Sequence, residues 1–253
     1  MTAKMLYIDI ETSALNVDTW SPWESNAIVI NRNWQVLGFS YAWDDGPIKN
    51  VYPHTIKGVS DYFVPANEKD EKLVLAEVWR LLDEADIVVA HNGDKFDLKK
   101  INARLIYHGF GPPTPYRPID TLKVAKKHFA FTYNRLDWLA QYFGFAGKLK
   151  HDGYPMWQGC MTGDKKSWQM MAKYNKQDIE ILRQAYKRMR EWMTNHPHVG
   201  GDGCPTCGTM DATRRGNRTS ASGLQYTQLK CKNCGAYYKG ARAIKGTSPA
   251  YRA

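Results

Sequence analysis

The chain has 253 residues, of which 43% are hydrophobic and 24% are charged, with 12 Pro and 20 Gly. This balance is typical of globular proteins and excludes collagen-like and wholly disordered chains. The longest apolar runs, such as residues 87–90, are far shorter than the ~18 residues of a membrane-spanning helix, and the N-terminus lacks the apolar stretch of a signal peptide. We therefore expect a soluble cytoplasmic protein with no membrane partner.

Strands and helices alternate before residue 195. Strands are expected at residues 6–10, 34–43, 48–52 and 87–90, with a fifth ending near Ile119. Helices are expected at 70–84, 95–107, 121–127, 136–143 and 168–193. The turn Asp44-Asp45-Gly46 joins the second and third strands as an antiparallel hairpin, whereas helices separate the later strands. The pattern predicts an α/β fold, a mixed sheet flanked by helices.

Residues 195–203, NHPHVGGDG, are rich in helix-breaking Gly and Pro and predict a linker. We therefore expect one domain over residues 1–198 and a small β unit over 199–253. In the second domain a strand over 224–229 leads into one cysteine pair, and residues 236–238 lead out of it. This is the hairpin layout of a zinc ribbon.

Four of the five cysteines form two CxxC pairs, Cys204/Cys207 and Cys231/Cys234. Two such pairs can place four thiolates around one Zn²⁺, with a glycine after each second cysteine to allow the tight turn. A secreted disulfide framework would also pair cysteines, but nothing in the sequence indicates secretion. The expected cofactor of this unit is one structural Zn²⁺, and Cys160 is expected to be an ordinary buried residue.

The net charge of +10 is concentrated at the C-terminal end. Residues 201–253 hold nine Lys or Arg and two Asp, a local charge of +7. Such a concentration is typical of proteins that bind nucleic acids, although it also occurs on merely solvated surfaces. The residues expected to contact nucleic acid are Arg214, Arg215 and Arg218, in a loop of the ribbon. The alternative is a ribbon that caps the fold or docks a protein.

Three acidic motifs occur in the first domain. In the first, Asp9-Ile10-Glu11, the two-residue period of a strand directs both carboxylates to one face, where two like charges favour a cation. The alternative is a strand end with two solvated acids.

The second motif, residues 91–97 (HNGDKFD), follows a buried strand and opens a helix. Ligands of α/β proteins bind at such strand ends. If Asp94 caps the helix, Asp97 serves only the helix start. Helical spacing instead places Asp97 on one stripe with Ile101 and Leu105, which points its carboxylate toward the sheet.

The third motif, residues 174–178 (YNKQD), lies in the last helix of the domain. Tyr174 and Asp178 are four residues apart and share a stripe with Met171 and Leu182. A carboxylate on this apolar stripe requires a metal, a basic partner or a polar cleft.

Together, YIDIET, HNGDKFD and YNKQD resemble the three motifs of the DEDD superfamily of 3′–5′ exonucleases: D-x-E, N-x3-(F/Y)-D and Y-x3-D. The resemblance implies an RNase H-like fold, with Asp9, Glu11, Asp97 and Asp178 as ligands of two Mg²⁺ or Mn²⁺ ions. Tyr174 matches the tyrosine that orients the attacking water. Position 173 is Lys, whereas the histidine branch of the superfamily has His there, so the chain resembles the tyrosine branch.

The resemblance also implies which residues contact the substrate and which reaction the protein catalyses. Thr12 and Leu15 match positions that hold the terminal nucleotide, although Ala14 replaces the usual Gly, and Asn92 and Phe96 belong to the second motif. The second motif is similar to that of the exonuclease domains of family B DNA polymerases, and the chain as a whole resembles the small stand-alone exonucleases of phages. The implied reaction is metal-dependent 3′–5′ hydrolysis of DNA in replication or repair, with DNA 3′ ends and replication proteins as partners.

Two other functions fit the same sequence. An exoribonuclease would keep the fold and the reaction, and a non-catalytic nucleic-acid-binding module would keep the fold alone. Trp20 and Trp23, in a polar stretch, and Tyr154 and Trp157, expected in a loop, either stack on bases or belong to the core. His151 is expected to be a surface or hydrogen-bonding residue. Asp120 is expected to cap the helix over 121–127.

Overall fold

The computed structural model describes residues 3–24, 26–56, 67–147, 149–220, 223 and 225–244. Leu224, at the expected strand start, and the basic residues Lys245 and Arg252 lie outside the described residues. The chain divides into two compact units, one of Lys4–Ala185 and one that combines the chain from Tyr186 onward with the N-terminal residues up to Ala3. The domain boundary at residues 198/199 stays a prediction. Among the described residues, no helix is both long and apolar enough to cross a membrane.

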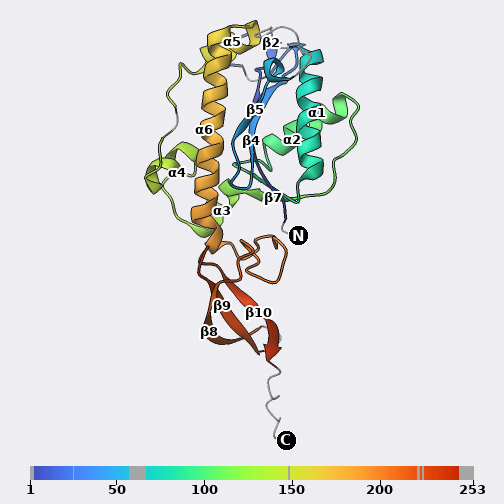
Figure 1. The fold of residues 1–253 in the computed structure, drawn as a ribbon. Helices are drawn as coiled ribbons and strands as arrows, with labels where there is room; N and C mark the ends of the chain where they lie inside the picture. Colours follow the sequence, from blue (N-terminus) through green and yellow to red (C-terminus); the bar gives the residue numbers. More distant parts are fainter. Residues whose placement is uncertain are drawn as a thin grey trace, which may run out of the picture. The chain divides into compact units, whose positions relative to one another are not determined.

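A five-stranded mixed sheet forms the first unit (Figure 1). Its order is β5 (Lys49–Val51), β4 (Val36–Trp43), β1 (Met5–Thr12), β6 (Ile87–Ala90) and β7 (Arg117–Asp120). The central strand β1 pairs antiparallel with β4 and parallel with β6. The predicted mixed sheet with flanking helices is thus confirmed.

Helices cover both faces of the sheet (Figure 1). The helices are α1 (Glu68–Glu84), α2 (Asp97–Tyr107), α3 (Thr121–His128), α4 (Leu136–Phe143), α5 (Tyr154–Thr162) and α6 (Lys165–Met189), with 3₁₀ turns at Pro53–Thr55 and Arg190–Trp192. One core cluster joins α1 and α2 to the sheet through residues such as Ile8, Val78 and Ile101. Another contains Leu37 of β4, Met156 of α5 and Trp168 of α6. The two faces of β1 and β4 therefore pack against different helices.

The structure decides three local questions that the sequence raised. Residues 154–162 form α5 rather than a loop. Pro155 does not prevent this helix, because a proline in the first turn removes no intrahelical hydrogen bond. Asp94 does not cap α2: the N-cap is Phe96, and the Asp94 carboxylate pairs with Lys123 at 2.5 Å. The expected cap at Asp120 is confirmed, because its side chain accepts from the backbone N–H groups of Leu122 and Lys123.

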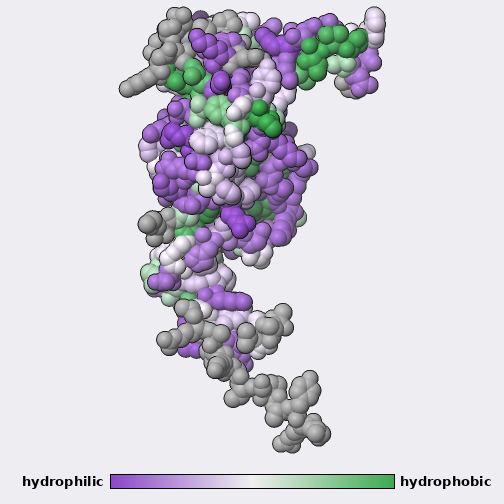
Figure 2. Space-filling model, turned by 90° about the vertical axis from the view of Figure 1, so that its right-hand side faces the viewer, coloured by the Kyte–Doolittle hydropathy of each residue, from purple (hydrophilic) through white to green (hydrophobic). Residues whose placement is uncertain are grey.

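A two-stranded hairpin, β2 (Asn16–Asp18) and β3 (Val29–Arg32), follows β1 and was not expected. Its apolar residues are exposed, including Val29 at 49% and Ile30 at 58%, and Figure 2 shows hydrophobic residues on an arm at the top of the view. Trp20 and Trp23, between its strands, are 84% and 93% exposed. Neither is a core residue, and base stacking by them stays a prediction.

The second unit contains a three-stranded antiparallel sheet of β8 (Ala212–Thr219), β9 (Gln225–Cys231) and β10 (Tyr237–Ile244), in the order β10-β9-β8. It carries the four cysteines of the two CxxC pairs, as the predicted ribbon requires. The segment with Arg214, Arg215 and Arg218 is strand β8, so the expectation of a loop was wrong. A bulge between Arg214 and Asn217 accommodates Gly216 at φ +85°, a backbone conformation that glycine adopts without strain.

Candidate functional site

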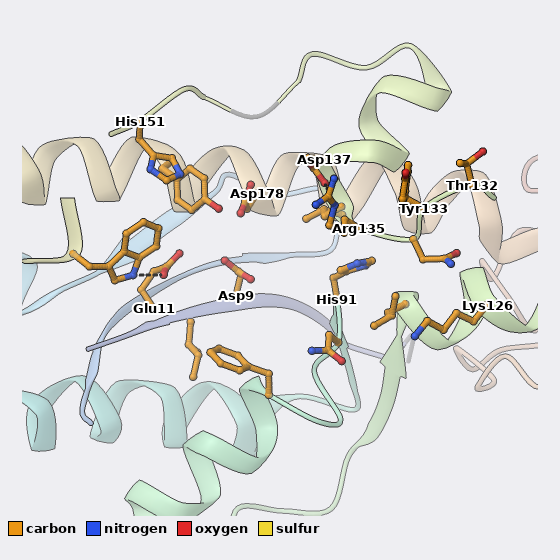
Figure 3. Close-up of a pocket in the computed structure, with 18 residues that line it drawn as sticks. Asp9, Glu11, His91, Lys126, Thr132, Tyr133, Arg135, Asp137, His151 and Asp178 are labelled. Carbon is orange, nitrogen blue, oxygen red and sulfur yellow. Dashed lines mark hydrogen bonds and ion pairs between the residues drawn. The ribbon is translucent and has the colours of Figure 1, made fainter. Parts of the chain in front are cut away.

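A cavity of about 850 Å³ lies within the unit of Lys4–Ala185 (Figure 3). It is lined by Asp9 and Glu11 of β1, by Asn92 from the turn after β6, and by Tyr174 and Asp178 of α6. Figure 3 shows the carboxylates of Asp9, Glu11 and Asp178 near one another in the space between β1 and α6. The fold thus brings all three acidic motifs to one place.

The alternation of β1 sets the direction of its two carboxylates. Ile8 and Ile10 are 0% and 3% exposed and pack in the core cluster with α1 and α2. Successive side chains of a strand point to opposite faces, so Asp9 and Glu11 point to the other face, which α6 covers. Glu11 is buried, at 8% exposure. A strand with an apolar and an acidic face therefore builds one wall of the cavity.

The helical period of α6 supplies the opposite wall. Met171 and Leu182 on the same stripe as Asp178 are buried in the core, and Asp178 itself is 3% exposed. Tyr174 lies one turn earlier and also lines the cavity. A buried ionised carboxylate is costly without compensation, and Asp178 faces two other acids, so the arrangement favours a cation in the cavity.

Asp97, the fourth acid, lies at the first residue of α2, beside the cavity rather than in its lining. Its Oδ1 accepts a hydrogen bond of 3.0 Å from the backbone N–H of Ile10, which lies between Asp9 and Glu11. The residue is 2% exposed, and burial, assisted by repulsion from Asp120, raises the pKa of its carboxyl group to about 7. The predicted stripe with Ile101 and Leu105 is buried, as expected.

Asn175 contacts the first motif directly, and the sequence reasoning assigned it no role. Its side-chain amide donates to Asp9 Oδ2 at 2.5 Å and to the Asp9 backbone carbonyl at 3.2 Å. Its own oxygen accepts from the hydroxyl of Tyr52 at 3.2 Å. Asn175 is fully buried on a stripe with Met171 and Ile179, and an amide at helical spacing between apolar core residues was the available signal.

Aromatic side chains form the end of the cavity near Glu11. The Trp157 indole N–H donates to Glu11 Oε2 at 3.2 Å. The ring of His151 packs edge-on against Trp157 and Tyr174, with centroids 5.2 and 4.8 Å away. His151 Nδ1 accepts from the backbone N–H of Gly153 at 3.0 Å, which fits its expected hydrogen-bonding role. Trp157 was missed as a contact of Glu11 because its helix was expected to be a loop.

The rest of the cavity lining mixes polar, aromatic and charged side chains. It includes Asn92, Phe96, Lys126, Arg135 and Asp137. Asn92 has φ +66°, a left-handed conformation that Asn tolerates better than most residues, and its backbone N–H donates to Asp120 Oδ1 at 2.9 Å. This left-handed backbone conformation accounts for an asparagine at position 92 of the second motif. Substrate contact by Asn92 and Phe96 stays a prediction.

Thr12 and Leu15 are not among the residues that line the cavity. The Thr12 hydroxyl accepts from Lys100 Nζ at 3.4 Å, and Leu15 is 49% exposed, just before β2. Arg214, Arg215 and Arg218 are exposed on β8 of the other unit. Nucleotide contact by these five residues stays a prediction.

The carboxylates suit hard cations by their chemistry. Oxygen donors are the ligands that Mg²⁺ and Mn²⁺ prefer. Within the part of the chain that the structure describes, no three of these acids bring their ligand atoms within 4.8 Å of one another; only the four cysteines form such a group. Close ionised carboxylates repel each other unless cations neutralise them.

The cysteine cluster fits one zinc ion closely. Cys204 Sγ lies 3.6 Å from Cys234 Sγ, and Cys207 Sγ lies 3.6 Å from Cys231 Sγ. Four thiolates ~2.3 Å from one tetrahedral ion stand about 3.8 Å apart. All five cysteines of the chain are free thiols, so the disulfide alternative is not found, and Cys160 is buried as expected.

The turns around the cysteines complete the metal centre. The glycines that follow the second cysteine of each pair, Gly208 and Gly235, have φ +75° and +74°. The backbone N–H of Cys234 donates to Cys231 Sγ at 3.4 Å. Amides aimed at sulfur stabilise thiolates, as a zinc site requires.

The hydrogen bonds around Asp9 predict a positioning role for Asn175. Asn175→Ala should raise the Mn²⁺ concentration at half-saturation about tenfold or more, since loss of an outer-shell partner typically costs 10–100-fold in metal affinity. Mn²⁺ titration followed by electron paramagnetic resonance measures this, with the melting temperature as the check on folding. Tyr52→Phe removes the hydroxyl that donates to Asn175 but leaves the contact of Asn175 with Asp9, and it should shift the titration less. An unchanged titration in Asn175→Ala contradicts the role.

Comparison with known proteins agrees with this geometry. Residues 50–190 match the family model described as RNase_H superfamily. A DNA polymerase III of the PolC type from Ureaplasma parvum serovar 3 is 31% identical over 136 residues, which make up 53% of this chain and 9% of the polymerase. The chain thus matches only a small part of that protein.

Among solved structures, the family B DNA polymerase of the archaeon Pyrobaculum calidifontis superposes with a TM-score of 0.55. The identity is 14%, and the match covers 89% of this chain and 32% of the polymerase. At this identity the likeness shows the fold alone.

Proposed function

Because the chain belongs to the RNase H superfamily, we propose that it is a metal-dependent 3′–5′ exonuclease that hydrolyses phosphodiester bonds of DNA. One observation carries the proposal. Acids of the first and third motifs, with Tyr174, line one cavity of the size of a nucleotide site, and Asp97 of the second motif lies beside it, bonded to the backbone of Ile10. DNA is the proposed substrate because the relative from Ureaplasma is a DNA polymerase.

The proposed metal ligands are Asp9, Glu11, Asp97 and Asp178. Bound Mg²⁺ or Mn²⁺ would supply charge stabilisation at the attacking and leaving oxygens of the phosphodiester. The Asn175 amide donates to one carboxylate oxygen of Asp9, and the Trp157 indole N–H donates to one carboxylate oxygen of Glu11. The Ile10 N–H does the same for Asp97. These donors fix the carboxylates before substrate arrives, which lowers the reorganisation needed for reaction.

Tyr174 would act through its hydroxyl group. It lines the cavity beside Asp178 and is held from the side by the ring of His151. A phenol at this place can accept or donate a hydrogen bond to the attacking water and so orient it. Orientation requires no ionisation of the phenol.

End-labelled oligonucleotides test the proposed reaction. The protein, dialysed free of added metal, is incubated with a single DNA strand labelled at either end, with Mg²⁺, with Mn²⁺ or with neither. We expect a 5′ label to give a ladder of shortened strands and a 3′ label to appear at once in mononucleotide, only when metal is added. Shortening from the 5′ end, internal cuts or no metal-dependent product would contradict the proposal. An RNA strand of the same sequence shows which sugar is preferred.

A further inference from the structure

The register of the three-stranded sheet sorts the residues of the second unit onto two faces. Tyr237 of β10 and Thr213 of β8 lie opposite Lys230 of β9. Along the strands, Lys239 lies opposite Gln228, and Arg218 lies opposite Tyr226. Side chains two positions apart on a strand share a face. One face therefore carries, besides Thr213, six residues that we call the tyrosine face: Arg218, Tyr226, Gln228, Lys230, Tyr237 and Lys239.

Contacts within the tyrosine face place each cation beside a polar or aromatic partner. Lys230 Nζ lies 5.5 Å from the centroid of the Tyr237 ring, and Lys239 Nζ lies 4.9 Å from that of Tyr226. Arg218 Nε donates to Gln228 Oε1 at 3.0 Å. Tyr237 is 52% exposed. The face thus presents aromatic rings and positive charges side by side to solvent.

The opposite face has a different composition and task. Arg214, Leu229 and Tyr238 lie opposite one another across the strands, and Arg214 Nη2 donates to Asn217 Oδ1 at 3.2 Å on the same side. Tyr238 packs against the cysteine cluster. The bulge in β8 thus places Arg214 and Arg218 on opposite faces although they are four residues apart.

Charge identifies the kind of partner. The segments 212–219, 225–231 and 237–244 contain no Asp or Glu. Asp211, just before β8, pairs with Lys232 at 2.9 Å. A sheet with several cations and no acids attracts a polyanion. Aromatic rings can stack on the unstacked bases of a single nucleic-acid strand, while the neighbouring cations contact its phosphates.

We propose that the tyrosine face binds single-stranded DNA, with bases stacked on Tyr226 and Tyr237 and phosphates held by Arg218, Lys230 and Lys239. The identification of the bound strand as DNA rests on the proposed exonuclease function. The identification of the tyrosine face as a binding surface does not. Duplex DNA would offer the phosphates but not the base faces, because its bases are stacked on one another.

Binding by matched variants tests the face. The full chain carrying Asp178→Ala, which prevents digestion, is titrated into fluorescein-labelled oligo(dT), and anisotropy is recorded at several salt concentrations. Arg218→Ala and Arg214→Ala remove the same charge from opposite faces of one strand. Lys230→Ala with Lys239→Ala removes two phosphate contacts, and Tyr237→Ala is compared with Tyr237→Phe. Zinc content and thermal melting of every variant verify that the sheet remains folded.

The expected pattern is specific to the face. Arg218→Ala should weaken binding severalfold and Arg214→Ala hardly at all. The double lysine variant should reduce the slope of log affinity against log salt by about 1.4, as two lost contacts to a single strand imply. Tyr237→Ala should weaken binding about fivefold or more, while Tyr237→Phe retains it.

Other outcomes would overturn the proposal. Equal losses in Arg214→Ala and Arg218→Ala would show attraction by net charge only, and unchanged binding in all variants would leave the ribbon to a protein partner. Duplex bound as tightly as oligo(dT) would contradict stacking. The assay reads binding alone, so a chain that binds through this face but yields no metal-dependent product would refute the exonuclease function and leave the face standing.

Discussion

Asp178→Asn should lower the rate of 3′–5′ cleavage by about a thousandfold or more, on the scale at which each ~1.4 kcal/mol is tenfold in rate and metal-assisted charge stabilisation supplies several kcal/mol. Asparagine has nearly the shape of aspartate, so the packing of the stripe with Met171 and Leu182 should survive. What is lost is the negative charge of a side chain that is 3% exposed, in a cavity lined by three other acids, Asp9, Glu11 and Asp137. Single-turnover cleavage with saturating Mg²⁺ measures the effect.

Glu180→Gln is the matched control for this charge. Glu180 lies two residues further along α6 and pairs with Arg183 and Gln184 instead of lining the cavity. The Glu180→Gln variant loses the same charge from the same helix and should cleave at the rate of the unaltered chain. Tyr174→Phe should fall between the two, because the metal ligands remain. Full activity in Asp178→Asn would refute the proposed ligand set.

The elements that build the cavity could be predicted because their periods are strong and local. The alternation of acidic and apolar residues in β1 and the stripe of α6 each place a carboxylate on a defined face. The order of strands around β1 follows from the rules for hairpins and crossovers. These patterns require no knowledge of distant contacts, and the structure places β1 at Met5–Thr12 and α6 at Lys165–Met189, close to the expected ranges.

The residues that hold the carboxylates could not be predicted in this way. Trp157 reaches Glu11 only because α5, which begins with a glycine at φ +74° and a proline, packs across the cavity. Asn175 reaches Asp9 from a helix remote in sequence. Hydrogen bonds between elements are decided by packing, and packing has no short-range signature in a single sequence.

Strand β8 shows a second limit. The run Arg214-Arg215-Gly216-Asn217-Arg218 has charges and a glycine, which are typical of loops. Its pairing with β9 and a bulge at the glycine make it a strand instead. Since one residue of slip exchanges the faces of a strand, only the observed register shows which arginine lies on which side.

Removal of zinc should unfold the sheet of β8, β9 and β10 and leave the helices of the first unit in place. The buried residues around the metal centre are three cysteines and Ala236, with Cys207 and Tyr238 partly buried. So small a core supplies little hydrophobic stabilisation, whereas zinc binding contributes an apparent ~10–16 kcal/mol in zinc-finger peptides. Cys207→Ser should therefore lose the metal and the order of all three strands, which amide hydrogen exchange of the full chain would detect as loss of protection.

Cys160→Ala separates this effect from the loss of any thiol. Cys160 lies in a core cluster with Trp168 and Met171, outside the metal centre. Its variant should retain one zinc per chain and the protection of the three strands, with a small loss of stability from the removed sulfur. Protected strands in a Cys207→Ser chain that has lost its zinc would show that the sheet folds without the ion. Zinc measured in the unaltered chain is assigned to the four cysteines, because no other described group of three or more His, Cys, Asp or Glu residues brings its ligand atoms within 4.8 Å of one another.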